Sequence, residues 1–404
     1  MGQSVHTARW IDQISDQGWN IHVFDLLDRG VCPELSGVTS HSVFPPPREA
    51  NGLVGWKSDF PFRRGAGFVR RNSPAFIRDR IFPPRINSLV DLIREFKPDI
   101  IHSLEMQNES YPLLEVRRRL GSEFAVPWIY SSWGNDIYHF GKQPEHSNRI
   151  RDVLAEVDYF IADCERDVRL ARDFGFAGEV LGVFPTAGSY DIHALRQATD
   201  IVKPSLRRSI ALKGYQSWQG RALLALDALQ LCAAELAGYR LEIYLPVPAV
   251  EERARAFSLA TGIPVTIHDQ TLNIEILKLF GRSRIGFSMS ITDGWPNSML
   301  ETMIMGAFPV QSDTVSTAEW ITGGENGLLI PPEDPAAAAV ALKRSLADDE
   351  MVDRAADINY QMVLKRIDRS VNKPQIVELY KKVFAQGKPF RLEDVQTGSI
   401  AASS

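Results

Sequence analysis

Residues 284–313 read RIGFSMSITDGWPNSMLETMIMGAFPVQSD, and this stretch decides the fold class. An apolar run ends at Met289, a loop of turn residues follows, a short amphipathic helix runs to Met305, and Gly306 leads into another apolar strand. This order predicts a strand, loop and helix unit in which backbone N–H groups at the helix start face whatever lies beyond the strand's carboxyl end. Such a unit can hold an anionic ligand without any cationic side chain.

Two carboxylates lie eight positions apart in this stretch, Asp293 in the loop and Glu301 one turn into the helix. If both face one cleft, one can reach a sugar hydroxyl and the other can accept hydrogen bonds from a ribose diol, because each carboxylate offers about four lone-pair sites. A purely structural interpretation stays open. Residues 298–301 form a capping-box pattern, and the dipeptide of Asp293 and Gly294 is common in turns.

The rest of the chain repeats the alternation of short β-rich runs and helical patterns that is typical of parallel sheets with helical crossovers. We predict strands at 21–25, 99–103, 128–132, 159–162, 209–213, 240–245, 265–268, 285–289 and 308–311. Helices are predicted at 87–96, 149–157, 167–174, 221–236, 274–282 and 334–347. A polar stretch at 187–204 separates two such series. The sequence therefore predicts an α/β fold with an N-terminal domain, a C-terminal domain, a helix that crosses back to the N-terminal domain and a flexible tail, at 1–195, 196–370, 371–387 and 388–404.

The beginning of the chain departs from this pattern. A doubly wound domain opens with a strand that feeds a glycine-containing turn and then a helix. Here a helical pattern over 7–16 starts almost at once. We expect that the first strand of the N-terminal domain is missing from this sequence.

Composition excludes several classes of protein. The chain has 404 residues, 45 Lys and Arg against 50 Asp and Glu, and a net charge of -5, which argues against a nucleic-acid partner. The three cysteines are widely separated and fit neither a disulfide framework nor a zinc site, so a cytoplasmic, reducing compartment is expected. No run approaches the ~20 apolar residues of a spanning helix, and the polar start is not a signal peptide.

Residues 284–313 resemble the acidic-x7-acidic motif of retaining GT-B glycosyltransferases of the family 4 (group 1) type. In that family a loop holding Glu, Gly, Pro and Asn leads into a helix with a second Glu, and residues 325–334 (ENGLLIPPED) look like the usual continuation. The resemblance covers both halves of the chain but is specific mainly over 288–334. It implies two Rossmann-like domains facing across a cleft. It also implies transfer of a hexosyl unit from a nucleotide-diphosphate sugar to a glycan, lipid-linked or small-molecule acceptor, with retention of configuration.

The resemblance also implies roles for individual residues. Glu301 would hold the nucleotide ribose, and Asp293 would act on the donor sugar. Asp293 stands where Glu is usual in the family and is one methylene shorter, which reduces its reach. The other donor-binding residues that follow from the resemblance are Gly294, Trp295, Pro296, Asn297, Ser298, Gly214, Tyr215 and Gly2, the last as the remnant of a phosphate-facing turn. No cofactor is expected, and the first expectation for the donor is a UDP-sugar.

The sequence offers two candidate cations for the donor diphosphate. Relatives carry Arg and Lys at positions that are Tyr215 and Gln219 here. A leaving group with close to two negative charges needs a replacement, and Lys213 and Arg221 flank the same loop. The alternative is that Lys213 only extends from a strand end and Arg221 is a solvated first-turn residue. With cations in these positions and no Asp-x-Asp dyad or His/Cys cluster in view, we expect no metal.

The N-terminal half contains a second strand-end loop, residues 127–137 (PWIYSSWGNDI), which looks like the place where this family often has His-Gly. Trp133 takes the histidine position, so the sugar contact would pass to Asn135 or Asp136. His102, which ends a predicted strand, is another candidate for a sugar or acceptor contact. A histidine at a strand end can equally be structural.

Residues 60–85 form a local exception to the acidic average, with seven arginines, five phenylalanines and one acid. Such a segment fits peripheral contact with anionic lipid headgroups at the inner face of a membrane, or with a phosphorylated, lipid-linked acceptor. It also fits an irregular basic loop packed through its phenylalanines.

Two function classes stay open. The first is the retaining hexosyltransferase, with a role in polysaccharide biosynthesis as one setting. The second is a catalytically weakened nucleotide-sugar-binding or partner protein on the same scaffold, suggested by Trp133, Tyr215, Gln219 and Asp293. A GT-B sugar epimerase is less favoured, because no second set of cleft acids stands out in this sequence. A Rossmann dehydrogenase is weaker still, because no G-x-G-x-x-G follows any predicted strand.

Overall fold

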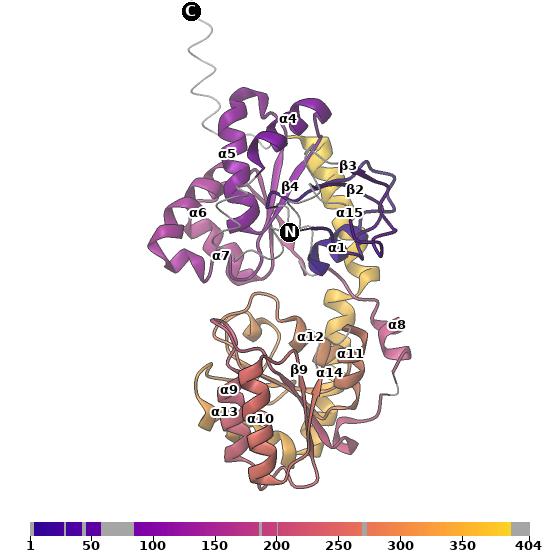
Figure 1. Ribbon diagram of the computed structural model, residues 1–404, viewed down its shortest axis with the longest axis vertical. Helices are drawn as coiled ribbons and strands as arrows, with labels where there is room; N and C mark the ends of the chain where they lie inside the picture. The colour runs from indigo at the N-terminus through magenta and orange to yellow at the C-terminus, as the bar shows by residue number, and fades with distance from the viewer. Residues whose placement is uncertain are drawn as a thin grey trace, which may run out of the picture. The chain divides into compact units, whose positions relative to one another are not determined.

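The computed structural model describes residues 4–27, 30–42, 46–57, 85–185, 188–199, 201–268 and 273–388. The chain divides into two compact units, of which unit 1 comprises residues 1–189 and 372–404 and unit 2 comprises residues 190–371. Figure 1 shows unit 1 in indigo to magenta with a yellow helix, and unit 2 in pink to orange. The chain therefore passes between the units at 189/190 and 371/372, where the sequence predicted 195/196 and 370/371.

Unit 2 is built on a parallel sheet of six strands in the order β10-β9-β8-β11-β12-β13. Their bounds are β8 Ser209–Lys213, β9 Arg240–Tyr244, β10 Val265–His268, β11 Ile285–Ser288, β12 Phe308–Ser312 and β13 Leu328–Ile330. β8 and β11 are central and pair in register, with Ile285 beside Ile210 and Phe287 beside Leu212. The loops that follow β8 and β11 therefore leave the sheet side by side.

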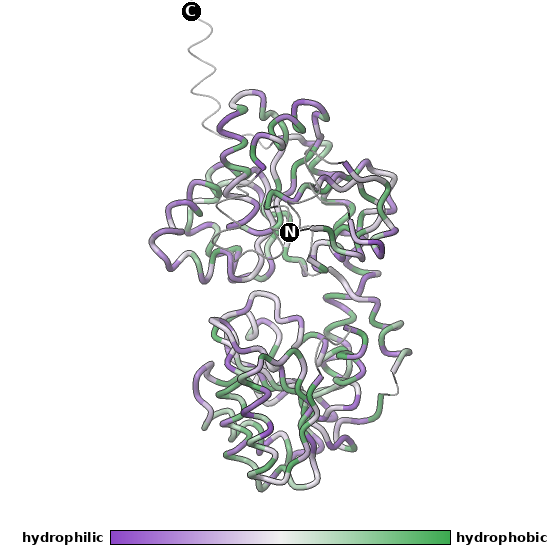
Figure 2. Tube along the Cα trace, viewed as in Figure 1, coloured by the Kyte–Doolittle hydropathy of each residue, from purple (hydrophilic) through white to green (hydrophobic). Residues whose placement is uncertain are grey.

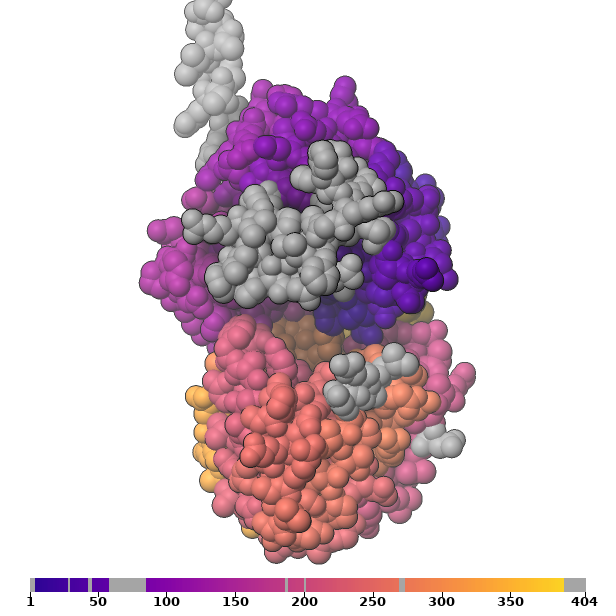
Figure 3. Space-filling model, in the orientation of Figure 1, coloured from indigo at the N-terminus to yellow at the C-terminus, as the bar shows by residue number. Residues whose placement is uncertain are grey.

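Helices cover both faces of this sheet. Their bounds are α8 Ile192–Gln197, η4 Pro204–Leu206, α9 Ala222–Leu231, α10 Pro248–Thr261, α11 Asn273–Arg282, α12 Asn297–Ile304, η5 Thr317–Glu319, α13 Pro335–Ala347 and α14 Asp349–Ile367. One buried cluster joins the strands to α9, α10 and α13, and another packs α11, α12 and α14 together on the other face. The hydrophobic positions gather along the strands in Figure 2, and Figure 3 shows, in pink to orange, the atoms that form the surface of unit 2 on this side.

Unit 1 contains two parallel sheets, of orders β4-β5-β6-β7 and β1-β2-β3. The strands are β1 His22–Phe24, β2 Thr39–His41, β3 Gly55–Lys57, β4 Ile101–Leu104, β5 Trp128–Ser131, β6 Tyr159–Ala162 and β7 Glu179–Val183. The helices are α1 Val5–Asp12, α4 Ile86–Phe96, the π-helix η1 Met106–Ser110, α5 Tyr111–Leu120, η2 Gly121–Glu123, η3 Phe140–Lys142, α6 Pro144–Glu156, α7 Glu165–Asp173 and α15 Arg369–Gln386. Within the described residues, α1 comes before the first strand.

The C-terminal helix α15 completes the core of unit 1. Ile376 and Val383 are fully buried in a cluster with Trp10 and Tyr159. The indole Nε1 of Trp10 donates to the hydroxyl oxygen of Tyr380 at 2.8 Å. After residue 348 the chain forms two helices, α14 and α15. They are separate because Asp368 between them adopts an extended conformation.

Helix α12, which carries Glu301, packs closely on β11 at a glycine. A Cβ atom added to Gly286 would lie 3.0 Å from the Cβ of Thr302 and closer still to the two γ atoms of that side chain. Real Cβ atoms do not approach that closely, so this strand position requires glycine. The contact fixes the distance between α12 and the sheet.

We predict that Gly286→Ala destabilises the protein by about 1–3 kcal/mol, because the added methyl group overpacks the contact between β11 and α12. Adding Thr302→Ala should restore part of this loss, since it removes the two nearest atoms. Gly323→Ala is the control, because a Cβ there meets no atom within 4 Å. Urea unfolding followed by circular dichroism measures all of these, and equal unfolding midpoints for Gly286→Ala and Gly323→Ala would contradict the prediction.

Candidate functional site

A polar cavity of about 130 Å³ lies in unit 2 beyond the carboxyl ends of β8 and β11. It brings together three of the predicted residues, Lys213, Tyr215 and Asp293. All of its lining residues come from the two strand ends and the loops that follow: Lys213, Tyr215, Gln219, Gly220, Ser288, Met289, Ser290, Thr292 and Asp293. Among these described lining residues Lys213 is the one cation and Asp293 the one acid, and both project from segments that parallel pairing places side by side.

The first wall of the cavity is the loop after β8. The backbone N–H of Arg221 donates to the carbonyl of Met289 at 2.9 Å, and that of Ile291 donates to the carbonyl of Gln219 at 3.0 Å. Gly214, predicted as donor-binding, is required here because a Cβ would lie 2.7 Å from the Cα of Pro246. These contacts join the two loops that line the cavity into one rigid edge.

Arg221 does not supply a second cation to this cavity. Its Nε donates to Glu333 Oε1 at 2.8 Å, and its Nη1 donates to the carbonyls of Ser217 and Gly220, each at 3.1 Å, and of Trp218 at 3.3 Å. The guanidinium thereby closes the loop on itself and does not line the cavity. In this structure Arg221 shapes the loop, and its expected role at the donor diphosphate stays a prediction.

Lys213 and Tyr215 lie next to each other at the cavity. Lys213 is the last residue of β8 and is half-buried, and its Nζ is 5.8 Å from the centre of the Tyr215 ring. Tyr215 is 39% exposed, so the ring is accessible to a ligand. An ammonium group at a strand end beside three hydroxyl-bearing side chains, Ser288, Ser290 and Thr292, suits a phosphate oxygen.

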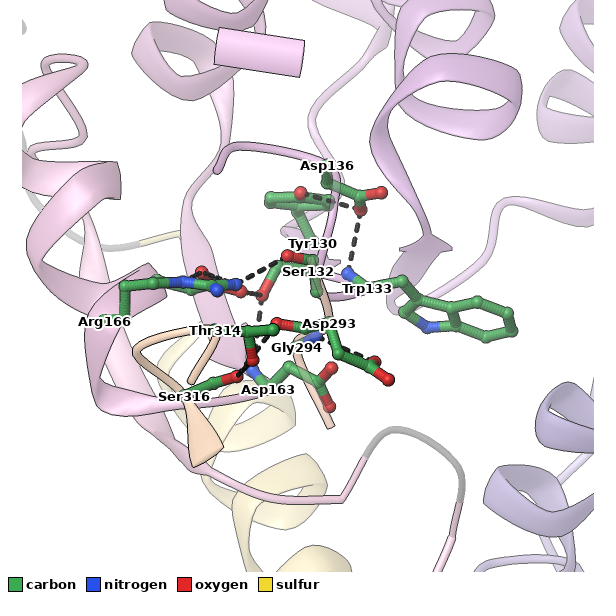
Figure 4. Close-up of polar contacts among 12 residues, drawn as sticks. Tyr130, Ser132, Trp133, Asp136, Asp163, Arg166, Asp293, Gly294, Thr314 and Ser316 are labelled. Carbon is green, nitrogen blue, oxygen red and sulfur yellow. Dashed lines mark hydrogen bonds and ion pairs between the residues drawn. The ribbon is translucent and has the colours of Figure 1, made fainter. Parts of the chain in front are cut away.

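Asp293 sits in a loop that is held from the segment after β12. The backbone N–H of Gly294 donates to Asp293 Oδ1 at 3.0 Å, and the hydroxyl of Ser316 donates to the backbone carbonyl of Asp293 at 2.8 Å. The hydroxyls of Ser316 and Thr314 are 3.1 Å apart. Figure 4 shows these contacts. The carboxylate position is thus set by its own loop.

Glu301 lies away from the lining of this cavity. It is 5% exposed, and its Oε1 accepts from Asn273 Nδ2 at 3.0 Å and from the hydroxyl of Tyr190 at 3.4 Å. The same hydroxyl is 3.3 Å from Oδ1 of Asn297, a predicted donor-binding residue. The structure therefore gives Asp293 and Glu301 separate surroundings.

The rest of the predicted loop is part of the fold. Trp295 is buried and meets Trp320 edge-on, with ring centroids 5.1 Å apart, so its side chain belongs to the core beside α12. The donor contact expected for residues 294–297 is made by the backbone, so it stays a prediction that this side-chain packing does not test. Pro296 precedes the first turn of α12, and the carbonyl of Ser298 accepts from the Thr302 hydroxyl at 2.7 Å.

In unit 1 the predicted sugar contact Asp136 is a structural carboxylate. It is 3% exposed, and its Oδ2 accepts from the backbone N–H of Trp133 and of Met106 and from the hydroxyl of Tyr130. Figure 4 shows Asp136 pointing back to Tyr130 and to the Trp133 nitrogen. Burial, with the nearby Glu105 carboxylate, raises the pKa of Asp136 well above its usual range. Asp136 shapes its own loop.

His102 is likewise used by the fold. Its Nδ1 is 2.6 Å from the Tyr380 hydroxyl and its Nε2 is 2.7 Å from the Ser131 hydroxyl, so both ring nitrogens have partners. Burial lowers the pKa of His102 to about 3. The predicted sugar or acceptor contact is corrected to a neutral structural histidine that ties β4 to β5 and α15.

The other residues predicted in the N-terminal half have different outcomes. Asn135 is half-buried, and its carbonyl accepts from the backbone N–H of His139 at 3.1 Å. Trp133 meets His6 edge-on at 5.7 Å, and its indole Nε1 has no hydrogen-bond partner among the described residues. Gly2, the arginine-rich residues 60–84 and the tail from 389 lie outside the described residues.

Sequence reasoning missed a group of buried charges in unit 1. Arg166, 4% exposed, pairs with Asp167 at 2.8 Å and donates to the carbonyl of Gly134 at 2.6 Å (Figure 4). Glu105 has a positive φ of 87° directly before the π-helix η1, and burial raises the pKa of Glu109 in that helix to about 7. Strained backbone and π-helical turns often accompany functional sites, but no local sequence pattern predicts where they occur.

Two family models match the chain, Glycosyl transferases group 1 over residues 207–348 and Glycosyl transferase 4-like over residues 75–163. Both models describe glycosyltransferases, and residues 207–348 match the group 1 family. No curated protein sequence matches it significantly.

Solved structures show the fold of this glycosyltransferase. Sucrose-phosphate synthase from Thermosynechococcus elongatus is 14% identical, with a TM-score of 0.67 over 95% of this chain and 94% of that one. HepE from Anabaena, in complex with UDP-glucose, is 15% identical, with a TM-score of 0.60 over 85% and 92%. A UDP-forming trehalose-phosphate synthase from Burkholderia vietnamiensis is 16% identical, with a TM-score of 0.59 over 81% and 78%. The fold is GT-B, as the sequence predicted.

Two features are absent from the described residues, a membrane-spanning helix and a metal-binding cluster. None of the described helices combines the length and the apolar character that crossing a membrane requires. In the described part of the chain no three His, Cys, Asp or Glu side chains are grouped so that they could hold a metal ion. Metal independence of the reaction stays a prediction.

We predict that His102 makes the protein less stable in acid. Its pKa is about 3 when folded against about 6.5 when unfolded, so below pH 6.5 the unfolded chain binds the extra proton and stability falls until about pH 3. Between pH 6.5 and pH 5 this loss amounts to about 2 kcal/mol.

The matched variant is His102→Gln, whose amide can still hydrogen-bond to Ser131 and Tyr380 but does not titrate. Urea unfolding of both proteins at pH 7 and pH 5 should show the smaller loss in the variant, because all other titrating groups are shared. Equal losses in the two proteins would show that His102 is not held neutral.

Proposed function

We propose that this glycosyltransferase moves a hexosyl unit from a nucleotide-diphosphate sugar, with a UDP-sugar as the first choice, to a glycan, lipid-linked or small-molecule acceptor with retention of configuration. The observation that carries the proposal is the cavity of unit 2. Lys213 at the end of β8 and Asp293 in the loop after β11 both line it. No cofactor takes part, and the donor sugar is the substrate.

Lys213 is the residue that we assign to the leaving diphosphate. Breaking the bond between the sugar and the nucleotide leaves negative charge on the β-phosphate, and a half-buried ammonium group stabilises that charge more strongly than one in water does. The hydroxyls of Ser288, Ser290 and Thr292 in the same lining can donate hydrogen bonds to phosphate oxygens. Hydroxyl donors and one lysine thus replace the two cations that resemblance led us to expect.

Asp293 is assigned to the donor sugar and Glu301 to the ribose. A carboxylate at the cavity can accept hydrogen bonds from sugar hydroxyls, and the buried Glu301 can accept from a ribose diol once the two Asn273 and Tyr190 donors have oriented it. Retention follows the resemblance: the leaving phosphate takes the acceptor proton on the face that it leaves, so no separate nucleophile is needed. The facing of the two domains across a cleft is part of this proposal.

Uracil as the base is supported by the similar structures. HepE was solved with UDP-glucose, and the trehalose-phosphate synthase is UDP-forming. The same proposal includes metal independence and a cytoplasmic location. It also includes contact of residues 60–85 with an anionic membrane or a lipid-linked acceptor.

A second candidate, a nucleotide-sugar-binding protein with little turnover, is favoured by one observation. The described lining holds one cation, Lys213, and one acid, Asp293, and Arg221 is used by its loop and by Glu333. The two candidates differ in turnover and agree in donor binding, so measuring both separates them.

We predict that Lys213→Met lowers the rate at which UDP is released from UDP-glucose by roughly 100-fold, because the charge on the departing phosphate loses its cation. Lys343→Met is the control, since Lys343 pairs with Glu235 on the surface at 2.8 Å. A coupled assay for UDP, with water as the acceptor, measures the rate. A Lys213→Met enzyme as fast as Lys343→Met would remove Lys213 from the reaction.

We predict that Asp293→Asn lowers that rate at least tenfold while the affinity for UDP changes less than twofold, because UDP lacks the sugar that Asp293 is assigned to bind. The wild-type protein and the variant are compared in the same assay and by calorimetry with UDP. If the wild-type protein binds UDP and UDP-glucose but releases no UDP with any acceptor tried, the binding-protein candidate replaces the transferase.

A further inference from the structure

The chain enters and leaves unit 2 through two segments that are hydrogen-bonded to each other. The backbone N–H of Tyr190 donates to the carbonyl of Ile367 at 3.2 Å, and that of Arg369 donates to the carbonyl of Tyr190 at 2.8 Å. Tyr190 and Asp368 thus form a parallel bridge. The units divide at 189/190 and 371/372, so this bridge lies at both passages of the chain between them.

The carboxylate of Asp368 strengthens the bridge. Its Oδ2 accepts from the backbone N–H of Ile192 at 3.3 Å, and its Oδ1 accepts from the backbone N–H of Ser370 at 2.9 Å. Asp368 is 7% exposed, so these bonds are shielded from water. Hydrogen bonds therefore hold together the two parts of unit 2 that lie next to the passages of the chain.

The side chain of Tyr190 extends from this bridge into the core beside α12. Tyr190 is 6% exposed and packs in the same buried cluster as Met299 and Leu300. Its hydroxyl is 3.4 Å from Glu301 Oε1 and 3.3 Å from Asn297 Oδ1. One residue thus belongs to the joining segment through its backbone and to the candidate donor site through its hydroxyl.

The contact matters because Glu301 is a buried carboxylate. A buried charge is stable only when donors surround it, and hydrogen bonds to a charged group are the stronger kind. Asn273 Nδ2 donates to Glu301 Oε1, and the single Tyr190 hydroxyl proton is shared between that oxygen and Asn297 Oδ1. A shift of the joining segment would move the Tyr190 hydroxyl and hence change the field at Glu301.

We propose that Tyr190 is a positioning residue that couples nucleotide binding at Glu301 to the segment joining the two units. The inference rests on the proposed function, in which Glu301 holds the ribose. Coupling is reciprocal, so a nucleotide that favours one arrangement of Glu301 also stabilises the Tyr190–Asp368 bridge. The Tyr190 hydroxyl is the group that transmits the effect in both directions.

The first measurement is calorimetry with UDP on the wild-type protein, Tyr190→Phe and Tyr360→Phe. Tyr190→Phe keeps the ring in the core and removes only the hydroxyl, and we expect UDP to bind it roughly threefold to tenfold more weakly. Tyr360→Phe is the matched control in the same unit, because its hydroxyl faces His193 at 3.4 Å. It should bind UDP as the wild-type protein does.

The second measurement is amide hydrogen exchange at Tyr190 and Arg369, the two N–H groups of the bridge. Saturating UDP should slow this exchange at least threefold in the wild-type protein and in Tyr360→Phe, and should leave it unchanged in Tyr190→Phe. A merely structural tyrosine would alter exchange equally with and without UDP. Asp368→Asn, which weakens the bridge itself, should also bind UDP more weakly and serves if Tyr190→Phe does not fold.

The outcomes separate the two levels of the proposal. A wild-type protein that binds no UDP overturns the proposed donor, and the coupling with it. A wild-type protein that binds UDP, together with a Tyr190→Phe protein that matches Tyr360→Phe in affinity and exchange, overturns the coupling alone. Loss of affinity and of the UDP-dependent protection in Tyr190→Phe supports both.

Discussion

The parallel pairing of β8 with β11 is the contact on which the candidate donor site depends. Parallel strands end at the same edge of a sheet, so the register between Phe287 and Leu212 places the loop after Lys213 next to the loop that carries Asp293. Gly286 then lets α12 approach β11 closely enough to set the position of Glu301. Lys213 and Asp293, which are 80 positions apart, thus come to one cavity because their two strands pair.

Polar residues in the strands and in the loops that follow them serve two purposes in this protein. In unit 1, His102 and Asp136 hydrogen-bond to neighbouring hydroxyls and backbone N–H groups. Burial lowers the pKa of His102 and raises the pKa of Asp136, so it favours the uncharged form of each side chain. In unit 2, Lys213 and Asp293 line a cavity instead. Position in or just after a strand therefore does not distinguish a ligand-binding residue from a structural one; the partners of its polar atoms do.

Much of the fold follows from sequence pattern. Strands β8 and β10 have the predicted bounds, because their apolar runs are bounded by turn residues. β7 was missed because all of its residues are half-buried and Gly182 interrupts the run, and β13 is only three residues long. Helices α5 and α10 were also missed, since their apolar positions are interrupted by charged residues.

The site could be predicted less completely, for physical reasons. Motif spacing and the family resemblance pointed to Asp293, and Lys213 was a candidate because it flanks the loop where relatives carry cations. The fold brings both to one cavity. The use of Arg221 depends on the conformation of its loop, whose carbonyls converge on the guanidinium. Tyr190 is 111 positions from Glu301, and only the folded chain places the two side chains together. Contacts of this range leave no local signal in a sequence.

The discontinuity of unit 1 has a consequence for biosynthesis. Unit 2 is one unbroken segment, whereas the buried cluster of Trp10, Tyr159 and Ile161 includes Ile376 and Val383 of α15, which are translated after all of unit 2. While the ribosome completes the chain, unit 2 can reach its native packing first, and unit 1 keeps an apolar face open to water until α15 emerges. This order makes the nascent N-terminal half a client for chaperones until the last helix docks.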